Sequence, residues 1–196
     1  VTPVAAIDGQ SAGVELTLDT GVERFDKVII ATHSDQALAM LAQPSALAQA
    51  TLGAVRYQSN TAVLHTDTAV LPQRKAAWAA WNYERAAGLD TERSQVCLHY
   101  LLNRLQPLPW RQPVIVSLNP VRPIDPAQVL GTYDYAHPVF DLPAVAAQGQ
   151  MHRLQGQGQC YFAGAWMGYG FHEDGLKAGL AAASRLLADA GRKVNI

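Results

Sequence analysis

The sequence has little charge. Charged residues make up 16% of its 196 residues, whereas soluble domains usually contain roughly 25%. The net charge is −1 and the pI is near 6.6, so the chain has no basic footprint of the kind that binds nucleic acid. Because few charges are available for the surface, we expect another segment, a cofactor or a partner to cover much of it.

Long apolar runs and cysteines are scarce as well. No run approaches the roughly 20 residues that a membrane-spanning helix needs, and no signal peptide is recognisable. The two cysteines, Cys97 and Cys160, lie in apolar, strand-like runs. This pattern indicates buried, reduced thiols rather than a disulfide framework. We therefore expect a cytoplasmic protein without a transmembrane segment, and peripheral contact with a membrane stays open.

Several catalytic signatures are missing. The sequence has no Cys/His spacing typical of metal sites, so no metal is expected, and it has no G-x-S-x-G elbow. No G-x-G-x-x-G dinucleotide fingerprint follows a predicted strand. The chain begins at Val1 without an initiator methionine, which indicates a fragment or a processed chain.

The stretch near the end of the chain is the most informative. Cys160–Ala163 is a short apolar run of strand length, and a glycine-containing loop separates it from a predicted helix that begins near Glu173. Gly175, Ala178 and Gly179 leave the first two helical turns almost bare. A strand, a glycine loop and a bare helix N-terminus point free amides at an electron-rich group. The same pattern also fits a close-packed strand–helix crossover without a ligand.

The residues of this stretch resemble a known family. Tyr161-Phe-Ala-Gly-Ala165, the pair Gly170-Phe171 and the run from Glu173 to Gly179 are similar to the C-terminal flavin-binding segment of FAD-dependent amine oxidoreductases. That superfamily includes protoporphyrinogen oxidases and phytoene desaturases. Gly168-Tyr-Gly-Phe-His-Glu-Asp-Gly-Leu176 resembles a bacterial group described as predicted NAD/FAD-binding proteins.

The resemblance implies a non-covalent FAD, because no cysteine matches the covalent attachment of some relatives. The implied cofactor-binding residues are Gly164, Ala165, Gly168, Gly170, Phe171, His172, Glu173 and Gly175. We expect the acidic side chains of Glu173 and Asp174 to face away from the flavin or to meet its ribityl or pyrophosphate region. In the family, the Gly-rich turn that holds the ADP half precedes these segments. The missing N-terminal half of the same protein is therefore the expected partner, and the isolated stretch is expected to be inactive.

The substrate is less well defined. Amine-oxidising relatives often place two aromatic rings beside the flavin, and Phe171 occupies one such position, where those enzymes usually have tyrosine. Tyr133, Tyr135 and Trp81 are further candidates for the substrate cavity. The family's flavin-proximal lysine has no convincing match, and Lys75 is the nearest candidate. The catalytic residues stay unassigned, and the substrate is expected to be a small molecule, either an amine or a hydrophobic, lipid-like compound.

The fold class expected is mixed α and β: a partial, Rossmann-like FAD domain plus an antiparallel-sheet substrate domain, without the N-terminal Gly-rich βαβ unit. Predicted strands cover residues 58–65, 76–83, 95–103 and 113–118, in a region where several prolines keep helices short. The predicted domains are an FAD-domain segment at 1–48, a substrate domain at 49–154, and a C-terminal FAD-domain strand–loop–helix at 155–196.

The sequence thus predicts the C-terminal part of a flavin-dependent oxidoreductase. Two alternatives remain at this stage: a non-catalytic binding or scaffold module that keeps the fold, and a lipid- or carotenoid-type desaturase or isomerase.

Overall fold

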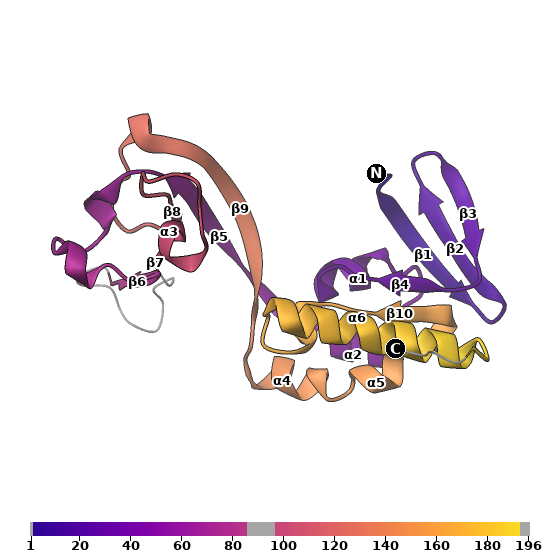
Figure 1. Ribbon diagram of the computed structural model, residues 1–196. Coiled ribbons are helices and arrows are strands. Elements are labelled where there is room, and N and C mark those ends of the chain that lie inside the picture. Colours follow the sequence, from indigo (N-terminus) through magenta and orange to yellow (C-terminus); the bar gives the residue numbers. More distant parts are fainter. Residues whose placement is uncertain (1, 86–96, 193–196) are drawn as a thin grey trace. The chain divides into compact units, whose positions relative to one another are not determined.

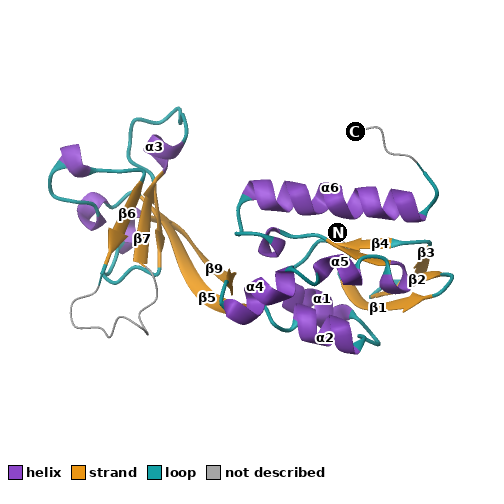
Figure 2. Cartoon of the chain, turned by 90° about the horizontal axis from the view of Figure 1, so that it is seen from below, coloured by secondary structure: helices purple, strands orange, loops and turns teal. Residues whose placement is uncertain are grey.

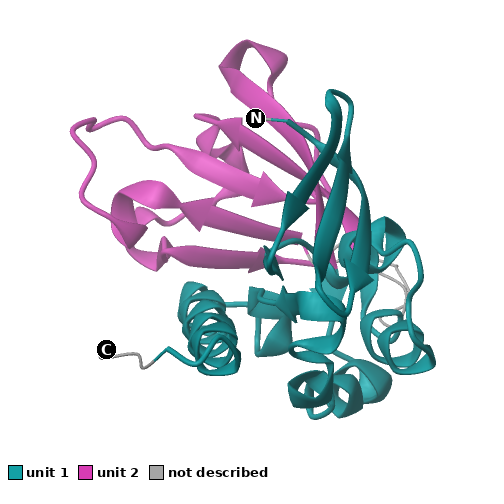
Figure 3. Ribbon diagram, turned by 90° about the vertical axis from the view of Figure 1, so that its right-hand side faces the viewer, with its two compact units in different colours: residues 1–57, 138–196 teal, residues 58–137 magenta. Residues whose placement is uncertain are grey.

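The computed structural model describes residues 2–85 and 97–192 (Figure 1). It divides into two compact units, the first formed by Val1–Tyr57 with Pro138–Ile196 and the second by Gln58–His137 (Figure 3). Among the described residues, no helix combines the length and the apolar character that crossing a membrane requires.

The first unit begins with an antiparallel meander and continues with a parallel strand pair and its helices. In chain order it contains β1 (Val4–Gln10), β2 (Gly13–Leu18), β3 (Gly21–Phe25), β4 (Val28–Ile30), α1 (Ser34–Met40), α2 (Ala46–Leu52), α4 (Leu142–Gln148), α5 (Met151–Leu154), η4 (Gln157–Gln159), β10 (Cys160–Phe162), η5 (Ala165–Met167) and α6 (His172–Asp189).

Strand β10 is the centre of this unit. It pairs in parallel with β4, and Cys160, Tyr161 and Phe162 are all buried. Because side chains alternate along a strand, Cys160 and Phe162 join the main apolar core, whereas Tyr161 and Ala163 pack against α6. Helix α6 accordingly covers one face of the β4–β10 pair, and the other helices cover the opposite face (Figure 2).

The second unit is built on a five-stranded sheet of order β6-β7-β8-β5-β9. Its elements are β5 (Arg56–His65), η1 (Thr68–Val70), η2 (Lys75–Ala77), β6 (Trp81–Glu84), β7 (Cys97–Leu101), α3 (Leu102–Leu105), β8 (Ile115–Leu118), η3 (Pro126–Gln128) and β9 (Val129–Val139). The pairs β6–β7, β7–β8 and β5–β8 are antiparallel. The chain enters this unit from the first one at the start of β5 and returns to the first unit at the end of β9.

Most predicted strands of this unit are present. The strand predicted at 76–83 begins only at Trp81, because residues 75–77 form a 3-10 turn. Residues 95 and 96 of the next predicted strand lie outside the described residues, and the strand runs from Cys97 to Leu101. The longest strand, β9, contains Tyr133 and Tyr135, whose spacing fits one face of a strand.

The compact units have different bounds from the predicted domains. The second unit is narrower than the predicted 49–154 domain, because the helices on both sides of it belong to the first unit. Leu52, Ala144, Met151 and Leu154 are buried in the same core as Phe162 of β10. Hydrophobic burial therefore assigns α2, α4 and α5 to the first unit. The flavin and substrate roles predicted for the domains remain a proposal.

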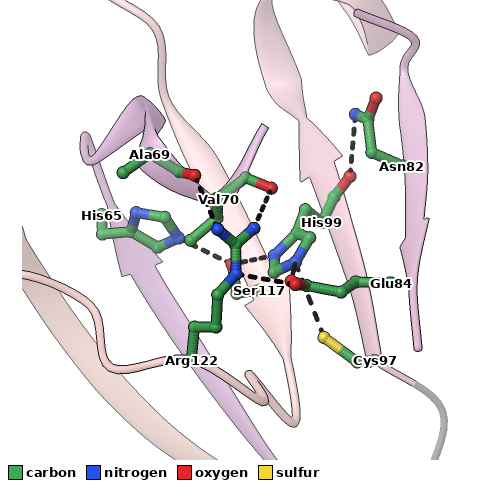
Figure 4. A network of polar contacts seen from close by, with 9 residues as sticks. All are labelled: His65, Ala69, Val70, Asn82, Glu84, Cys97, His99, Ser117 and Arg122. Atoms are coloured by element: carbon green, nitrogen blue, oxygen red, sulfur yellow. Dashed lines mark hydrogen bonds and ion pairs between the residues drawn. The ribbon is translucent and has the colours of Figure 1, made fainter. Parts of the chain in front are cut away.

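A row of buried polar side chains crosses the second unit (Figure 4). His65 Nδ1 accepts the backbone N–H of Asp67 at 3.1 Å, so the proton of the neutral ring is on Nε2, 2.7 Å from Ser117 Oγ. Ser117 Oγ lies 2.6 Å from His99 Nδ1, and His99 Nε2 lies 2.9 Å from Glu84 Oε2. His65, Ser117 and His99 thus each donate a hydrogen bond to the next residue of the row, which ends at Glu84. Every ring nitrogen in the row has a partner.

This row makes the stability of the protein dependent on pH. Burial is the main cause that lowers the pKa of His65 below its usual 6.5. At acidic pH His65 therefore binds a proton more readily in the unfolded chain than in the folded chain. The free energy of unfolding should accordingly fall as the pH drops below 6.5. The pKa values of Asp67 and Glu84 are themselves lowered, so their contributions are lost only at more acidic pH.

We expect His65→Gln to remove part of this fall between about pH 5 and 6.5, with His152→Gln, at an exposed histidine of α5, as the control. Urea unfolding followed by tryptophan fluorescence, with Trp166→Phe in every variant to silence the one tryptophan of the first unit, reports on the second unit, because Trp78, Trp81 and Trp110 lie in it. Parallel pH profiles for the wild-type chain and His65→Gln would contradict this assignment.

Candidate functional site

The predicted site lies where β10 passes through a loop into α6. Gly164 follows the strand in an extended conformation, and a Cβ at this position would collide with the Trp166 indole. The indole Nε1 donates to the Thr32 carbonyl at 3.0 Å, just after the end of β4. The first half of the loop is therefore fixed to the carboxyl ends of both parallel strands, where open α/β sheets bind ligands.

Asp174 organises the second half of the loop. Its Oδ2 accepts the backbone N–H groups of Tyr169, at 3.1 Å, and of Phe171, at 3.0 Å. A Cβ on Gly168 would meet Asp174 Oδ1 at 2.6 Å, and Gly170 has φ +87, a conformation that favours glycine. The glycines of this loop thus permit a backbone path that the Asp174 carboxylate holds in place.

Gln148 of α4 supports the same loop from outside it. Its side-chain Nε2 donates to the Trp166 carbonyl at 2.9 Å and to the Gly168 carbonyl at 2.7 Å. Local sequence patterns could not indicate this contact, because Gln148 lies 20 residues before Gly168 and outside the strand–loop–helix stretch.

The first turn of α6 leaves two backbone donors available. The N–H groups of Asp174 and Gly175 donate to the Phe171 carbonyl at 3.0 and 3.2 Å. Those of His172 and Glu173 have no hydrogen-bond partner within the described part of the chain. They stand at the positive end of an 18-residue helix, and such a pair of amides can hold an electron-rich group.

The two acidic residues at the helix start have different environments. The Glu173 carboxylate lies 3.4 Å from Lys177 Nζ, and both side chains are more than 60% exposed. Asp174 instead faces the loop amides and forms part of the site. The two acids were expected to face away from the flavin or to meet its ribityl or pyrophosphate region, and only Glu173 forms a purely outward contact.

Helix α6 packs through its smallest residues. Ala178 and Ala182 are buried against Tyr161 and Ala163, whereas Leu176 and Leu180 are 57% and 43% exposed. Among the described residues, and apart from the backbone of α6 itself, a Cβ on Gly179 would have no atom within 4 Å, and a Cβ on Gly175 would meet only Ala165 at van der Waals distance. An apolar strip with little side-chain bulk thus faces outward beside the free amides.

The candidate aromatic residues occur in both units. Phe171 is an exposed residue of the loop in the first unit. In the second unit, Tyr133 and Tyr135 of β9 have ring centroids 6.4 Å apart, and Trp81 packs edge-on against Tyr100 at 5.2 Å. All three of these candidate side chains are exposed. Lys75 Nζ lies 5.8 Å from the Trp78 ring, in the turn before β6.

The sequence has no match among family models and none among curated proteins, whereas the fold is similar to solved structures. A CLA-producing fatty acid isomerase from P. acnes has a TM-score of 0.61 at 11% identity, over 98% of this chain and 48% of its own. Cyclohexylamine oxidase from Brevibacterium oxydans IH-35A has a TM-score of 0.55 at 13% identity, over 97% of this chain and 49% of its own. A triple mutant of putrescine oxidase with redesigned cofactor binding has a TM-score of 0.59 at 12% identity, over 96% of this chain and 48% of its own.

At these identities the comparisons establish the fold. The predicted fold class and the predicted resemblance are confirmed at that level: the chain is a mixed helix-and-sheet protein matching the C-terminal part of amine oxidase-like structures. It spans about half the length of the solved structures it matches.

Adjacent acids offer a matched test of the loop. We expect Asp174→Ala to lower the free energy of unfolding by about 1 kcal/mol, because two backbone amides lose the acceptor that caps them. Glu173→Ala should change it by less than about 0.5 kcal/mol, since an exposed pair contributes little. Urea denaturation of the 196-residue chain measures both, and equal effects would show that Asp174 does not hold the loop.

Proposed function

We propose that the chain is the C-terminal part of a flavin-dependent oxidoreductase, in which hydride passes from an amine or hydrophobic substrate to non-covalently bound FAD. The observation that carries the proposal is the pair of free amides on His172 and Glu173, presented beside a braced glycine loop. The fold shared with amine oxidase-like structures supports it.

The chemistry of the donor set fits a flavin. FAD, when bound, supplies the hydride acceptor, and its reduction places negative charge on the N1 and C2 carbonyl side of the ring. The amides of His172 and Glu173 are oriented by the helix before any charge appears, so they need little reorganisation to stabilise it. In a partly buried site the helix terminus contributes up to about 2 kcal/mol. Gly175 and Gly179 leave room for a flat group beside them.

The cysteines support a non-covalent mode of binding. Cys97 and Cys160 are both buried, and burial raises the pKa of the Cys97 thiol and raises that of Cys160 to about 11. Both thiols therefore stay protonated at neutral pH and are poor nucleophiles. The flavin would be held by hydrogen bonds, by apolar contact with α6, and by the N-terminal half of the protein that we propose as the partner of this chain.

The Phe171 ring favours a second candidate function. Phe171 presents an apolar ring without a hydroxyl group to orient an amine, and one of the similar structures is a fatty acid isomerase. The alternative is therefore a lipid-type isomerase or desaturase that uses the same cofactor site. Tyr133, Tyr135 and Trp81 stay candidates for the substrate cavity in either case.

Two glycines at opposite ends of α6 provide a test of the flavin site. Gly170 (φ +87) and Gly191 (φ +68) both need a left-handed backbone, but only Gly170 lies in the proposed site. We expect the protein that contains this chain, purified at its natural length, to show the absorption bands of flavin. Denaturation should release this flavin into solution. Gly170→Val should lose most of the flavin, and Gly191→Val should retain it. A colourless wild-type protein, or full occupancy in folded Gly170→Val, would refute the site.

Phe171 also allows the substrate classes to be separated. We expect unsaturated lipids to bleach the oxidised flavin anaerobically faster than polyamines do, because the wall of the site is apolar. Phe171→Ala should slow this bleaching at least about tenfold, and Phe25→Ala, at an exposed phenylalanine of the meander, should leave it unchanged. Fast bleaching by polyamines and none by lipids would assign the protein to the amine-oxidising class.

A further inference from the structure

Three possible metal-binding side chains converge on one face of the sheet in the second unit. Cys97 and His99 are two residues apart on β7, so they point to the same side, and Glu84 of β6 is the cross-strand partner of Cys97. Each of the three residues offers one ligand atom, and these atoms all lie within 4.8 Å of one another. In Figure 4 dashed lines join the His99 ring to Glu84 and to Cys97.

We propose that Glu84, Cys97 and His99 form a binding site for a zinc-like divalent ion. This site lies outside the proposed flavin site and does not depend on it. Two ligands of one tetrahedral zinc ion stand about 3.6 Å apart for sulfur and nitrogen and about 3.3 Å apart for nitrogen and oxygen. The Cys97 Sγ–His99 Nε2 distance is 3.6 Å and the His99 Nε2–Glu84 Oε2 distance is 2.9 Å. The Glu84 carboxylate must therefore move about 0.4 Å away from His99 and come to about 3.6 Å from Cys97 Sγ, from which it now lies within 4.8 Å.

The residues around the three ligands are those that a metal site needs. His99 uses its other nitrogen, Nδ1, to contact Ser117 Oγ at 2.6 Å, and Glu84 uses its other oxygen, Oε1, to bind Arg122 Nε at 2.7 Å. Partners of this kind fix the orientation of ligating histidines and carboxylates. Arg122 also donates to the carbonyls of Ala69 and Val70, which hold its guanidinium beside the carboxylate rather than in the ligand triangle.

Ligand chemistry selects the class of metal. A thiolate and an imidazole favour zinc and other borderline-soft ions over magnesium and calcium, which prefer oxygen ligands. One thiolate and one carboxylate neutralise a dication. Cys97 and His99 are each 1% exposed, whereas the Glu84 side chain is 22% exposed. Glu84 therefore lies on the side from which an ion reaches the site.

Binding requires a defined rearrangement of protons. The ion takes the position of the proton on His99 Nε2, so the proton of the neutral ring moves to Nδ1 and points at Ser117. The Ser117 hydroxyl must then turn its hydrogen away from His99. Cys97 loses its thiol proton, so one proton leaves the protein for each ion bound at neutral pH.

Cobalt(II) alone, added to the full 196-residue chain, is the first probe. Coordination by Cys97 should produce a thiolate-to-cobalt charge-transfer band that saturates at one ion per chain, and added zinc should abolish the band. The matched variants are Cys97→Ala and Cys160→Ala, which each remove one buried thiol from a strand. The proposal requires the band to vanish in Cys97→Ala and to persist in Cys160→Ala.

Glu84→Gln keeps the shape of the side chain and serves where Cys97→Ala does not fold, as judged by circular dichroism. It should retain the charge-transfer band but weaken cobalt binding at least about tenfold. Absence of the band in the folded wild-type chain, its persistence in folded Cys97→Ala, or unchanged cobalt affinity in Glu84→Gln would overturn the proposal. The three residues would then form a hydrogen-bonded network only.

Discussion

The first unit depends on the complete burial of β10. Cys160 and Phe162 fill the main core and Tyr161 and Ala163 fill the contact with α6, so a shift of one residue would move every side chain to the wrong face. The register with β4 is fixed for the same reason, with Tyr161 opposite Ile29. Where the strand ends, the chain must turn at Gly164, and from there the loop and the start of α6 are set within a few residues.

The same strand explains why half of a larger fold is a reasonable interpretation. Parallel sheets normally have both faces covered and several strands, yet within residues 2–85 and 97–192 β4 and β10 form a two-stranded pair. Ile29 in β4 and Leu176 and Leu180 in α6 are exposed. The chain also covers just under half of the solved structures it resembles. Each observation agrees with the proposal that further protein and a cofactor cover this apolar surface.

Local patterns in the sequence predicted this region well, because a glycine loop between a strand and a helix is a contiguous signal. They did not predict which acid faces the loop. Glu173 and Asp174 are neighbours, and only the shorter side chain, at the third helical position, reaches the amides of Tyr169 and Phe171. Local patterns also could not give the bounds of the compact units, since the inclusion of α2, α4 and α5 in the first core depends on contacts between distant segments.

The cluster in the second unit could not have been found from spacing at all. Cys97 and His99 alternate with apolar residues as in any half-buried strand, and Glu84 lies 13 positions before Cys97 in the sequence, with a stretch between them that the structure does not describe. The strand register, which places Glu84 opposite Cys97 and His99 opposite Ser117, brings these side chains together. A buried row of this kind is costly unless every polar atom is paired. Within the described chain each of its members has a partner, so the same side chains can stabilise the sheet without an ion and bind one after a single proton is released.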